Sequence, residues 1–317
     1  MARIWPIGGG KGGTGKSFLT GSIGILLARQ RFRTLLIDAD LGSANLHTIL
    51  GIPHPEISLS DFINKKLKSL QETILQMPIP NLFLISGARN KLDIANLAHE
   101  HKMKMLRAIS RLDYDYILLD LSAGTSFNTI DFFTLSDSGV FVCCPEPTSI
   151  ENFYRLIRSV YIRKIRQILK TDRFRKLSEK AEARNQDAII NQPEYLLDTL
   201  KEMDLEQGRM IEGIMQAFQF KLVLNQVRKQ DNPKIGILIC KIIERHLGLR
   251  IQFIGNVSFD DRIHDEICRK VPFIDKYPYS AATMDLKNVT KGIVDVANGQ
   301  AEVVTAFTET DHNTFSG

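Results

Sequence analysis

The chain has 317 residues, 44% of them hydrophobic and 24% charged, with a formal net charge of +5. This is an ordinary globular composition, and the chain is long enough to bury a core in one large α/β domain or two smaller ones. No apolar run approaches the ~20 residues that span a bilayer, and no charged and apolar leader precedes the first strand, so we expect a cytoplasmic protein. The four cysteines include no C-x-x-C pair, which argues against a disulfide framework and an iron–sulfur carrier.

A glycine-rich loop, residues 8–17 with the sequence GGGKGGTGKS, follows the first apolar run, residues 4–7. Its spacing is that of a phosphate loop, and residues 18–31 continue as a helix-forming stretch. Glycines let backbone N–H groups face a phosphate, a lysine adds positive charge, and a serine hydroxyl can bind Mg²⁺. The alternative, a glycine-rich turn without a ligand, is disfavoured by the strand before the loop and the helix after it. The predicted nucleotide-binding residues here are Gly10, Gly12, Gly13, Thr14, Gly15, Lys16 and Ser17, with Lys16 also catalytic and Ser17 also a metal ligand.

A second lysine, Lys11, lies inside the loop. The resulting Lys-Gly-Gly-Thr-Gly-Lys-Ser segment resembles the deviant phosphate loop of the MinD/ParA family of dimerising ATPases. In that family the early lysine reaches the partner subunit's nucleotide. The resemblance therefore implies that Lys11 is catalytic in trans and that ATP drives homodimer formation. A solvated loop lysine is the alternative.

Two carboxylates, Asp38 and Asp40, follow the apolar run Thr34-Leu-Leu-Ile37. Such a run predicts a buried parallel strand whose carboxyl end faces the ligand. The segment resembles the first switch of the MinD/ParA family, which implies that Asp40 positions the attacking water and that Asp38 supports the metal. The alternative for either aspartate is a helix N-cap.

A third carboxylate, Asp120, closes the apolar strand predicted at residues 114–121. A carboxylate in this position fits the second acidic element of a nucleotide site, which holds magnesium through water. The Ser-Ala-Gly-Thr stretch that follows resembles the second switch of the same family, which implies that the backbone N–H of Gly124 senses the γ-phosphate. Ser122 stands where the family often has proline.

Further elements alternate as expected for a doubly wound sheet. Helices are predicted near residues 59–67, 99–112, 234–247 and 260–268, and strands at 82–86, 140–144, 220–224 and 251–256. The Pro-Glu-Pro-Thr-Ser segment at 145–149, with the switch residues and the Leu-Ser-Asp-Phe-Ile segment, looks closest to the FlhG (FleN) branch of MinD-like ATPases. The resemblance covers residues 4–157 and continues from about residue 220.

Residues 155–176 carry nine Lys or Arg and one acid, Asp172, on a pattern that predicts a long amphipathic helix with a basic face. A solvated helix face is the default interpretation. The functional one is a polyanion such as DNA, bound through cations that include Arg163, Lys164 and Arg166. Residues 171–217 are polar and helical in pattern, and we expect a helical insertion there that binds a partner or supports the dimer.

Two further predicted nucleotide-binding residues, Asn225 and Arg228, follow the strand predicted at 220–224. In the family an asparagine here recognises the adenine edge, since its amide supplies a donor and an acceptor. Guanine recognition would use Asn-Lys-x-Asp, whereas residue 226 is Gln and residue 228 is Arg, so ATP is favoured over GTP. Pro6 lies inside the first predicted strand, which is tolerable only where its missing N–H is not needed.

The C-terminus differs from that of MinD and FlhG proteins, which usually end in a basic amphipathic helix that binds membrane. Residues 292–317 contain no Lys or Arg and four acids, Asp295, Glu302, Glu309 and Asp311. Anionic lipid repels such a segment, so direct membrane binding by this end is not expected. We expect residues 298–317 to form a flexible acidic tail.

The sequence therefore predicts a single phosphate-loop NTPase domain with a doubly wound, mostly parallel α/β sheet, ATP and Mg²⁺ as ligands, and an unidentified protein partner. The resemblance implies an ATP-dependent dimeric switch. Three roles remain open: a FlhG-like or MinD-like regulator of the placement or number of a polar structure such as the flagellum, a ParA-like DNA-segregation ATPase, and an ATP-dependent small-molecule synthetase on the same scaffold.

Overall fold

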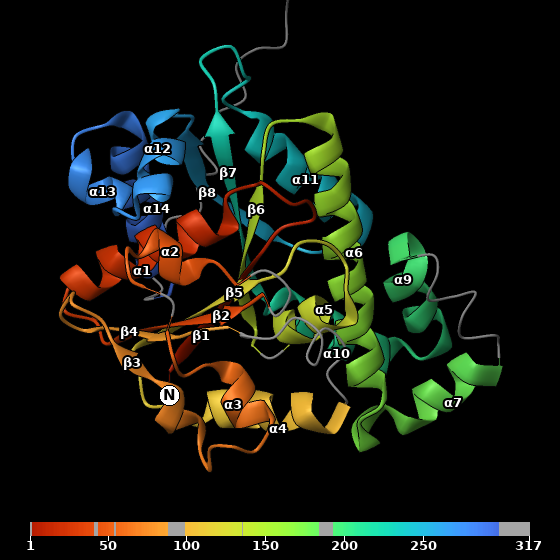
Figure 1. The fold of residues 1–317 in the computed structure, drawn as a ribbon. Helices are drawn as coiled ribbons and strands as arrows, with labels where there is room; N and C mark the ends of the chain where they lie inside the picture. Colours follow the sequence, from red (N-terminus) through yellow and green to blue (C-terminus); the bar gives the residue numbers. More distant parts are fainter. Residues whose placement is uncertain are drawn as a thin grey trace, which may run out of the picture.

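The computed structural model describes residues 2–40, 44–53, 55–87, 99–134, 136–183 and 193–297. Its centre is an eight-stranded sheet in the order β3-β4-β2-β5-β1-β6-β7-β8, with helices on both faces (Figure 1). Neighbouring strands are parallel except for β3 and β4, which are antiparallel. This confirms the predicted doubly wound, mostly parallel α/β fold.

The strands are short and their side chains alternate between the two faces, as strand geometry requires. They are β1 (Arg3–Gly8), β2 (Thr34–Ala39), β3 (Leu75–Gln76), β4 (Leu82–Ile85), β5 (Tyr116–Leu121), β6 (Ser138–Cys143), β7 (Gln219–Val227) and β8 (Ile251–Ser258). In β2, for example, Leu35 and Ile37 belong to one core and Leu36 to the other. Each core is covered by its own set of helices.

One face of the sheet packs against α1 (Lys16–Arg29), α2 (Leu46–Ile49), α12 (Arg262–Arg269), α13 (Phe273–Lys276) and α14 (Ala281–Ala297). The other face packs against α3 (Leu59–Ile63), α4 (His99–Ser110), α5 (Phe127–Phe133), α6 (Pro147–Leu169), α7 (Arg175–Ala183), α9 (Pro193–Met203), α10 (Leu205–Gln216) and α11 (Ile235–Leu247). Two 3₁₀ turns, η1 (Leu70–Thr73) and η2 (Asp172–Phe174), complete the described elements. No helix in these ranges is both long and apolar enough to cross a bilayer.

Pro6 lies in the central strand β1, where a missing N–H would usually break a ladder. β1 pairs with β6 only from Ile7 onward, and the carbonyl of Ile4 instead accepts a hydrogen bond of 2.7 Å from the hydroxyl of Ser136. The β6 ladder therefore begins just beyond the proline.

The segment predicted as a helical insertion contains η2, α7, α9 and α10, which follow α6 and precede β7. Leu196, Leu200, Ile211 and Met215 from this segment are buried in the same core as α6. In Figure 1 these helices lie beside the lower half of α6. The tail predicted at residues 298–317 lies outside the described residues.

The basic helix differs from its prediction, because much of its charge is used within the chain. α6 ends at Leu169, and Lys164 lies on its buried side with 5% exposure. The Lys164 ammonium donates to the carbonyls of Thr134 and Ser136 at 3.2 and 3.0 Å. Arg163 pairs with the buried carboxylate of Asp131 at 2.7 Å. Two of the cations named for a polyanion, Arg163 and Lys164, instead fasten α6 to α5 and the turn after it, and DNA binding by the remaining cations of residues 155–176 stays a prediction.

Lys221 is a second buried cation, on β7, the strand next to the edge strand β8. Its side chain is 1% exposed, and its ammonium donates to the Gln219 carbonyl at 3.0 Å and lies 5.4 Å from the centre of the Trp5 ring. Because burial disfavours the charged form, it lowers the pKa of Lys221 to about 8. No carboxylate among the described residues forms an ion pair with it.

We expect Lys221→Met to raise the free energy of unfolding by about 3 kcal/mol at pH 7, since a pKa lowered by 2 to 3 units costs this much in the folded state. The folded pKa lies below the unfolded one, so the cost is complete below pH 8 and fades as the pH rises towards 10.5. Urea denaturation of both proteins at pH 7 and pH 10 measures this. If the difference in free energy of unfolding between the two proteins is the same at both pH values, the charge of Lys221 is not its source. The control is Lys170→Met, a substitution at an exposed lysine.

Candidate functional site

The predicted site residues gather at the carboxyl ends of β1, β2 and β5, three adjacent strands of the sheet (Figure 1). The phosphate loop runs from the end of β1 to Lys16, the first residue of α1. Gly13 and Gly15 adopt left-handed φ angles of 79° and 81°, which glycine tolerates best. Because of these two turns the loop leads directly into the N-terminus of α1, where unpaired backbone N–H groups favour an anion.

Gly10 marks a close approach between the loop and α6. A Cβ atom added to Gly10 would lie 2.1 Å from the carbonyl oxygen of Asn152 and 2.6 Å from the amide nitrogen of Phe153. Gly12 has no neighbouring atom within 4 Å of the corresponding position. The first glycine of the phosphate-loop pattern is therefore needed for packing, whereas Gly12 lies on the open side of the loop.

Lys16 lies beside two carboxylates, Asp40 and Asp120, and is 7% exposed. Burial lowers the pKa of its ammonium, while the charges of Asp120 and Asp40 act in the opposite direction. The lysine thus stays beside negative side chains at the start of α1. A buried ammonium in such a place can bind the terminal phosphates of a nucleotide.

Asp38 and Asp120 are side by side, since they are paired residues in the register of β2 and β5. Both are 1% exposed. Burial, and then the neighbouring Asp120 charge, raise the pKa of Asp38 to about 8. Burial raises the pKa of Asp120 to about 6, although hydrogen bonding from Ser17 and the charge of Lys16 lower it. Two adjacent buried carboxylates with raised pKa values are a suitable environment for a divalent cation.

Asp38 also anchors the chain that follows β2. Its carboxylate accepts hydrogen bonds from the backbone N–H groups of Asp40 at 3.3 Å and Leu46 at 3.0 Å. Leu46 is the first residue of α2, so Asp38 supplies an acceptor to a helix N-terminus. This contact is similar to the N-cap role that was the alternative interpretation of Asp38. The role of Asp38 in supporting the metal stays a prediction.

Asp40 lies on the rim of the site and is partly exposed. Its Oδ1 accepts a hydrogen bond of 3.1 Å from the hydroxyl of Ser122, which follows β5. The serine that replaces the family's usual proline therefore links the two predicted switches. This leaves Asp40 beside Lys16 and Asp120, where a water-positioning carboxylate is expected.

Lys11 contacts its own chain. Its ammonium lies 3.1 Å from a carboxylate oxygen of Glu146 and 3.2 Å from the hydroxyl of Thr148, both at the start of α6. Both partners of the ion pair are about half exposed, so the pair is weak. The sequence did not predict these contacts, although Glu146 and Thr148 belong to the Pro-Glu-Pro-Thr-Ser segment that it singled out.

The second switch is joined to the phosphate loop through the backbone. Gly124, with a left-handed φ of 88°, donates its N–H to the carbonyl oxygen of Gly9 at 3.0 Å. Thr20 on α1 donates its hydroxyl to Asp120 at 3.3 Å. A shift of the loop would therefore also move Gly124, the residue predicted to sense the γ-phosphate.

Asn225 and Gln226 brace the other side of the loop from the end of β7. The side-chain amide of Asn225 donates to the Thr14 carbonyl at 2.9 Å, and that of Gln226 donates to the Gly13 carbonyl at 2.8 Å. Sequence reasoning assigned Asn225 to base recognition and assigned no role to Gln226. The left-handed φ of 60° at Gln226 is a local signal of a constrained position.

Arg228 lies at the far side of the same edge. Its guanidinium stacks on the ring of Phe259, which follows β8, at 3.9 Å from the ring centre. Its backbone N–H donates to Asp231 at 2.7 Å. Phe259 is 41% exposed, so part of its ring remains accessible beside the Arg228 guanidinium.

The donor set fits a magnesium ion that shares its coordination with phosphate. Within the described ranges no group of three or more His, Cys, Asp or Glu side chains could hold a metal ion alone. Mg²⁺ is commonly held by one or two carboxylates together with substrate phosphates and waters. Ser17, Asp38 and Asp120 are consistent with that arrangement, because the other ligands come from the nucleotide and solvent.

Comparison with known proteins adds a family match. A model described as the CobQ/CobB/MinD/ParA nucleotide binding domain matches residues 6–273. The antiactivator FleN of Pseudomonas aeruginosa is 22% identical over 294 residues, which are 92% of this chain and 86% of FleN. The septum site-determining protein MinD of Helicobacter pylori is 30% identical over 158 residues, 50% of this chain and 58% of that protein. The chain thus spans little more than half the length of this MinD relative.

Solved structures show the same fold at lower identity. A septum site-determining protein MinD from Pyrococcus horikoshii OT3, complexed with Mg-ADP, superposes with a TM-score of 0.61 at 18% identity, covering 96% of this chain and 100% of that chain. The ATP complex of a Cyanothece McdA variant superposes with a TM-score of 0.58 at 16% identity, covering 96% and 99% of the two chains.

Proposed function

Because the chain belongs to the CobQ/CobB/MinD/ParA nucleotide-binding family, we propose that it is an ATP-hydrolysing switch that requires Mg²⁺ and forms a homodimer when ATP is bound. The observation that carries the proposal is the convergence of Lys16, Asp38, Asp40 and Asp120 at the N-terminus of α1. The family match supports nucleotide binding, and the arrangement of these side chains supports hydrolysis.

Each residue of the site has a role in this proposal. Lys16 and the loop N–H groups bind the β- and γ-phosphates. Ser17 and Asp120 hold magnesium, with support from Asp38, and the ion would supply positive charge to the phosphate oxygens. Asp40 orients the attacking water, and the Ser122 hydroxyl holds its carboxylate. Asn225 keeps the loop closed against β7, beside the expected base site.

Adenine remains the proposed base. Arg228 and Phe259 form a cation–aromatic pair at the ends of β7 and β8, which suits a purine of either kind. The choice of ATP over GTP rests on the sequence, since the Asn-Lys-x-Asp arrangement of guanine recognition is not present at residues 225–228.

Dimerisation is proposed to use Lys11. In the structure the lysine is held by Glu146 and Thr148 of its own chain. To reach a nucleotide in a second subunit it must leave these partners, and the exposed ion pair opposes this only weakly. Nucleotide state would then decide between the two positions of Lys11 and so between monomer and dimer.

For the biological role we propose a spatial regulator of the MinD or FleN kind. The match to FleN over 92% of the chain supports this choice. The ParA-like alternative loses its main support, because Arg163 and Lys164 of α6 are engaged within the chain. The protein partner is unidentified, and the segment spanning η2, α7, α9 and α10 is the proposed place for it or for support of the dimer.

Light scattering of the purified protein with ADP, and with ATP and Mg²⁺, tests the proposal. We expect ATP to convert a monomer into a dimer, Asp40→Ala to accumulate the ATP dimer because hydrolysis stops, and Lys11→Ala to stay monomeric. A chain whose oligomeric state ignores the nucleotide, or whose dimer forms without Lys11, would contradict the switch and favour a small-molecule synthetase. Urea denaturation of both variants shows that they are folded.

A further inference from the structure

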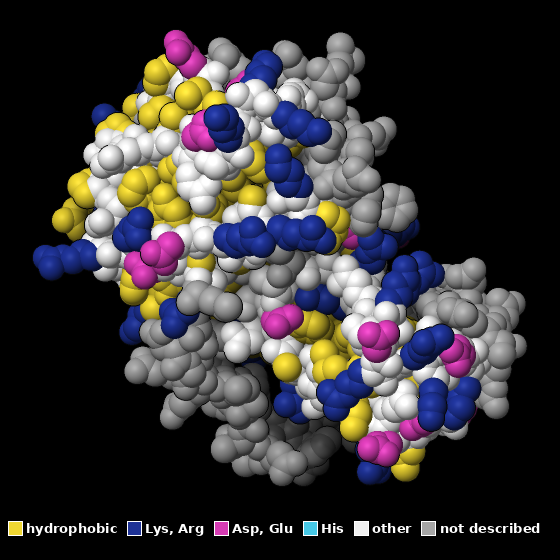
Figure 2. Space-filling view, turned by 90° about the horizontal axis from the view of Figure 1, so that it is seen from below, with side chains coloured by type: hydrophobic (Ala, Val, Ile, Leu, Met, Phe, Trp, Pro, Cys, Tyr) yellow, Lys and Arg dark blue, Asp and Glu magenta, His cyan; other side chains and the backbone are white. Residues whose placement is uncertain are grey.

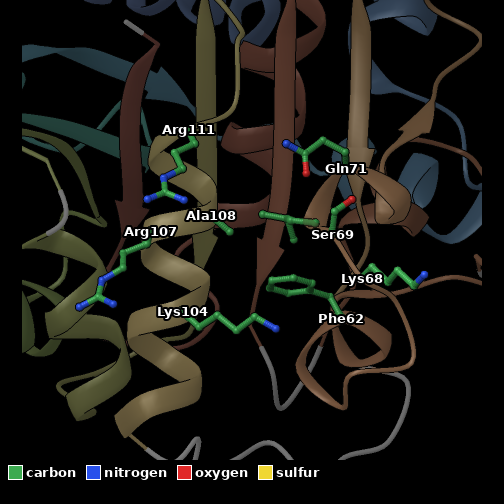
Figure 3. Close-up of a pocket in the computed structure, with 9 residues that line it drawn as sticks. Phe62, Lys68, Ser69, Gln71, Lys104, Arg107, Ala108 and Arg111 are labelled. Atoms are coloured by element: carbon green, nitrogen blue, oxygen red, sulfur yellow. The ribbon is translucent and has the colours of Figure 1, made fainter.

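A basic pocket lies away from the nucleotide site, between η1 with the preceding helix α3 on one side and α4 on the other (Figure 3). Its volume is about 420 Å³, within the range of ligand-binding clefts. Lys68 comes from one wall, and Lys104, Arg107 and Arg111 come from the other. In Figure 3, Lys104 extends from α4 towards Phe62, whereas the guanidinium groups of Arg107 and Arg111 extend from α4 away from Phe62.

The pocket carries four positive charges and, among the described residues that line it, no negative one. All four cations are exposed. The acids of the same segment are engaged elsewhere: Asp61 accepts a hydrogen bond from the Ser58 amide at 3.0 Å, and Glu72 accepts one from the Ser69 amide at 2.8 Å. Both carboxylates stabilise their own helical turns and leave the cations of the pocket uncompensated.

Spacing along α4 places its three cations on one side of the helix. Lys104, Arg107 and Arg111 follow one another at three and four residues, so their side chains share a face. The surface outside the pocket is also basic: Figure 2 views the molecule from the side on which α3 and α4 lie in Figure 1, and Lys and Arg outnumber Asp and Glu there. Such a field attracts anionic partners over several ångströms.

The floor of the pocket is apolar. Phe62 and Leu70 are buried there, Ala108 is half-buried, and the Lys104 ammonium lies 4.6 Å from the centre of the Phe62 ring. An inorganic anion would gain nothing from this floor. An acidic chain with one large apolar side chain would bury that side chain on the floor while its carboxylates meet the cations at the rim.

We propose that this pocket binds an acidic segment of a partner protein, anchored by one aromatic or large aliphatic side chain. The site is separate from the nucleotide site, so the proposal does not depend on ATP hydrolysis. It replaces α6 as the basic surface offered to a partner, since the α4 cations are exposed whereas Lys164 is buried.

Fluorescence anisotropy with a labelled peptide Glu-Asp-Glu-Phe-Glu-Asp-Glu tests the proposal, with Mg-ADP present to keep the phosphate loop occupied. We expect the wild type to bind it, and Lys104→Glu/Arg107→Glu to bind at least about tenfold more weakly, because two favourable contacts become repulsive. The neutral double variant Arg107→Gln/Arg111→Gln should also bind more weakly, which keeps the test valid if the charge reversal perturbs folding. Lys170→Glu/Lys291→Glu, an equal charge change at exposed sites outside the pocket, should bind as the wild type does.

Three outcomes would overturn the proposal. Equal losses in the pocket variants and the Lys170/Lys291 variant would assign binding to net charge alone. Equal affinity for a peptide with glycine in place of phenylalanine would show that the apolar floor is not used. Binding of inorganic tripolyphosphate or duplex DNA to the same cations, without binding of the peptide, would assign the pocket to phosphate instead.

Discussion

Gly10→Ala is expected to lower the free energy of unfolding by at least about 3 kcal/mol and to remove nucleotide binding. The added Cβ would lie 2.1 Å from the Asn152 carbonyl oxygen, far inside contact distance. That atom belongs to the backbone of α6, which cannot turn aside as a flexible side chain could. The loop, or the start of α6, must therefore move. Urea denaturation and binding of a fluorescent ATP analogue measure the two effects.

Gly12→Ala is the matched control, since the same methyl group would meet no atom within 4 Å. We expect its urea midpoint to equal that of the wild type. Equal stability of the Gly10 and Gly12 variants would mean that the loop does not pack against α6 as described.

Lys16→Met should reduce ATP turnover by at least about 100-fold, the usual cost of removing one preorganised charge donor from an active site. Lys16 is the buried cation beside Asp40 and Asp120, so its loss removes the lysine charge that is proposed to bind the γ-phosphate. Steady-state ATPase assays and nucleotide affinity separate an effect on chemistry from one on binding.

Lys16→Arg separates charge from shape. It keeps the positive charge, but its planar guanidinium is larger than the ammonium at a position that is 7% exposed, so we expect most activity to be lost. Turnover by the Met variant within about threefold of the wild type would contradict the role of Lys16. Lys170→Met, far from the loop in sequence and exposed, should have normal activity.

Much of the fold could be predicted because its signals are local. The strands that became β2 and β5 are continuous apolar runs ending in Asp38 and Asp120, and parallel strands bring such ends to one edge. The glycine pattern of residues 8–17 is also a local signal, so the loop could be predicted from it. Elements with weak signals were missed: β3 has two residues, and α2 and α13 have four each. α14 is long but was considered only for its charge.

Side-chain partners could not be predicted from the pattern. Lys164 and Lys170 look alike in the sequence, yet one is buried beneath Phe218 and the other is exposed, because the turn after α5 supplies carbonyl acceptors to Lys164 alone. Likewise, the Asp131 that neutralises Arg163 is 32 residues away in the chain. Such contacts depend on how α5 and α6 cross, which no local spacing encodes.

α6 joins two distant parts of the molecule as a single rod. Its 23 residues correspond to a length of about 34 Å at 1.5 Å per residue. Its first turn lies beside Lys11, and its last turn contacts η2 and α7. Arg163 and Lys164 fasten the middle of this rod to α5, so one continuous helix connects the surroundings of the phosphate loop with α5, η2 and α7.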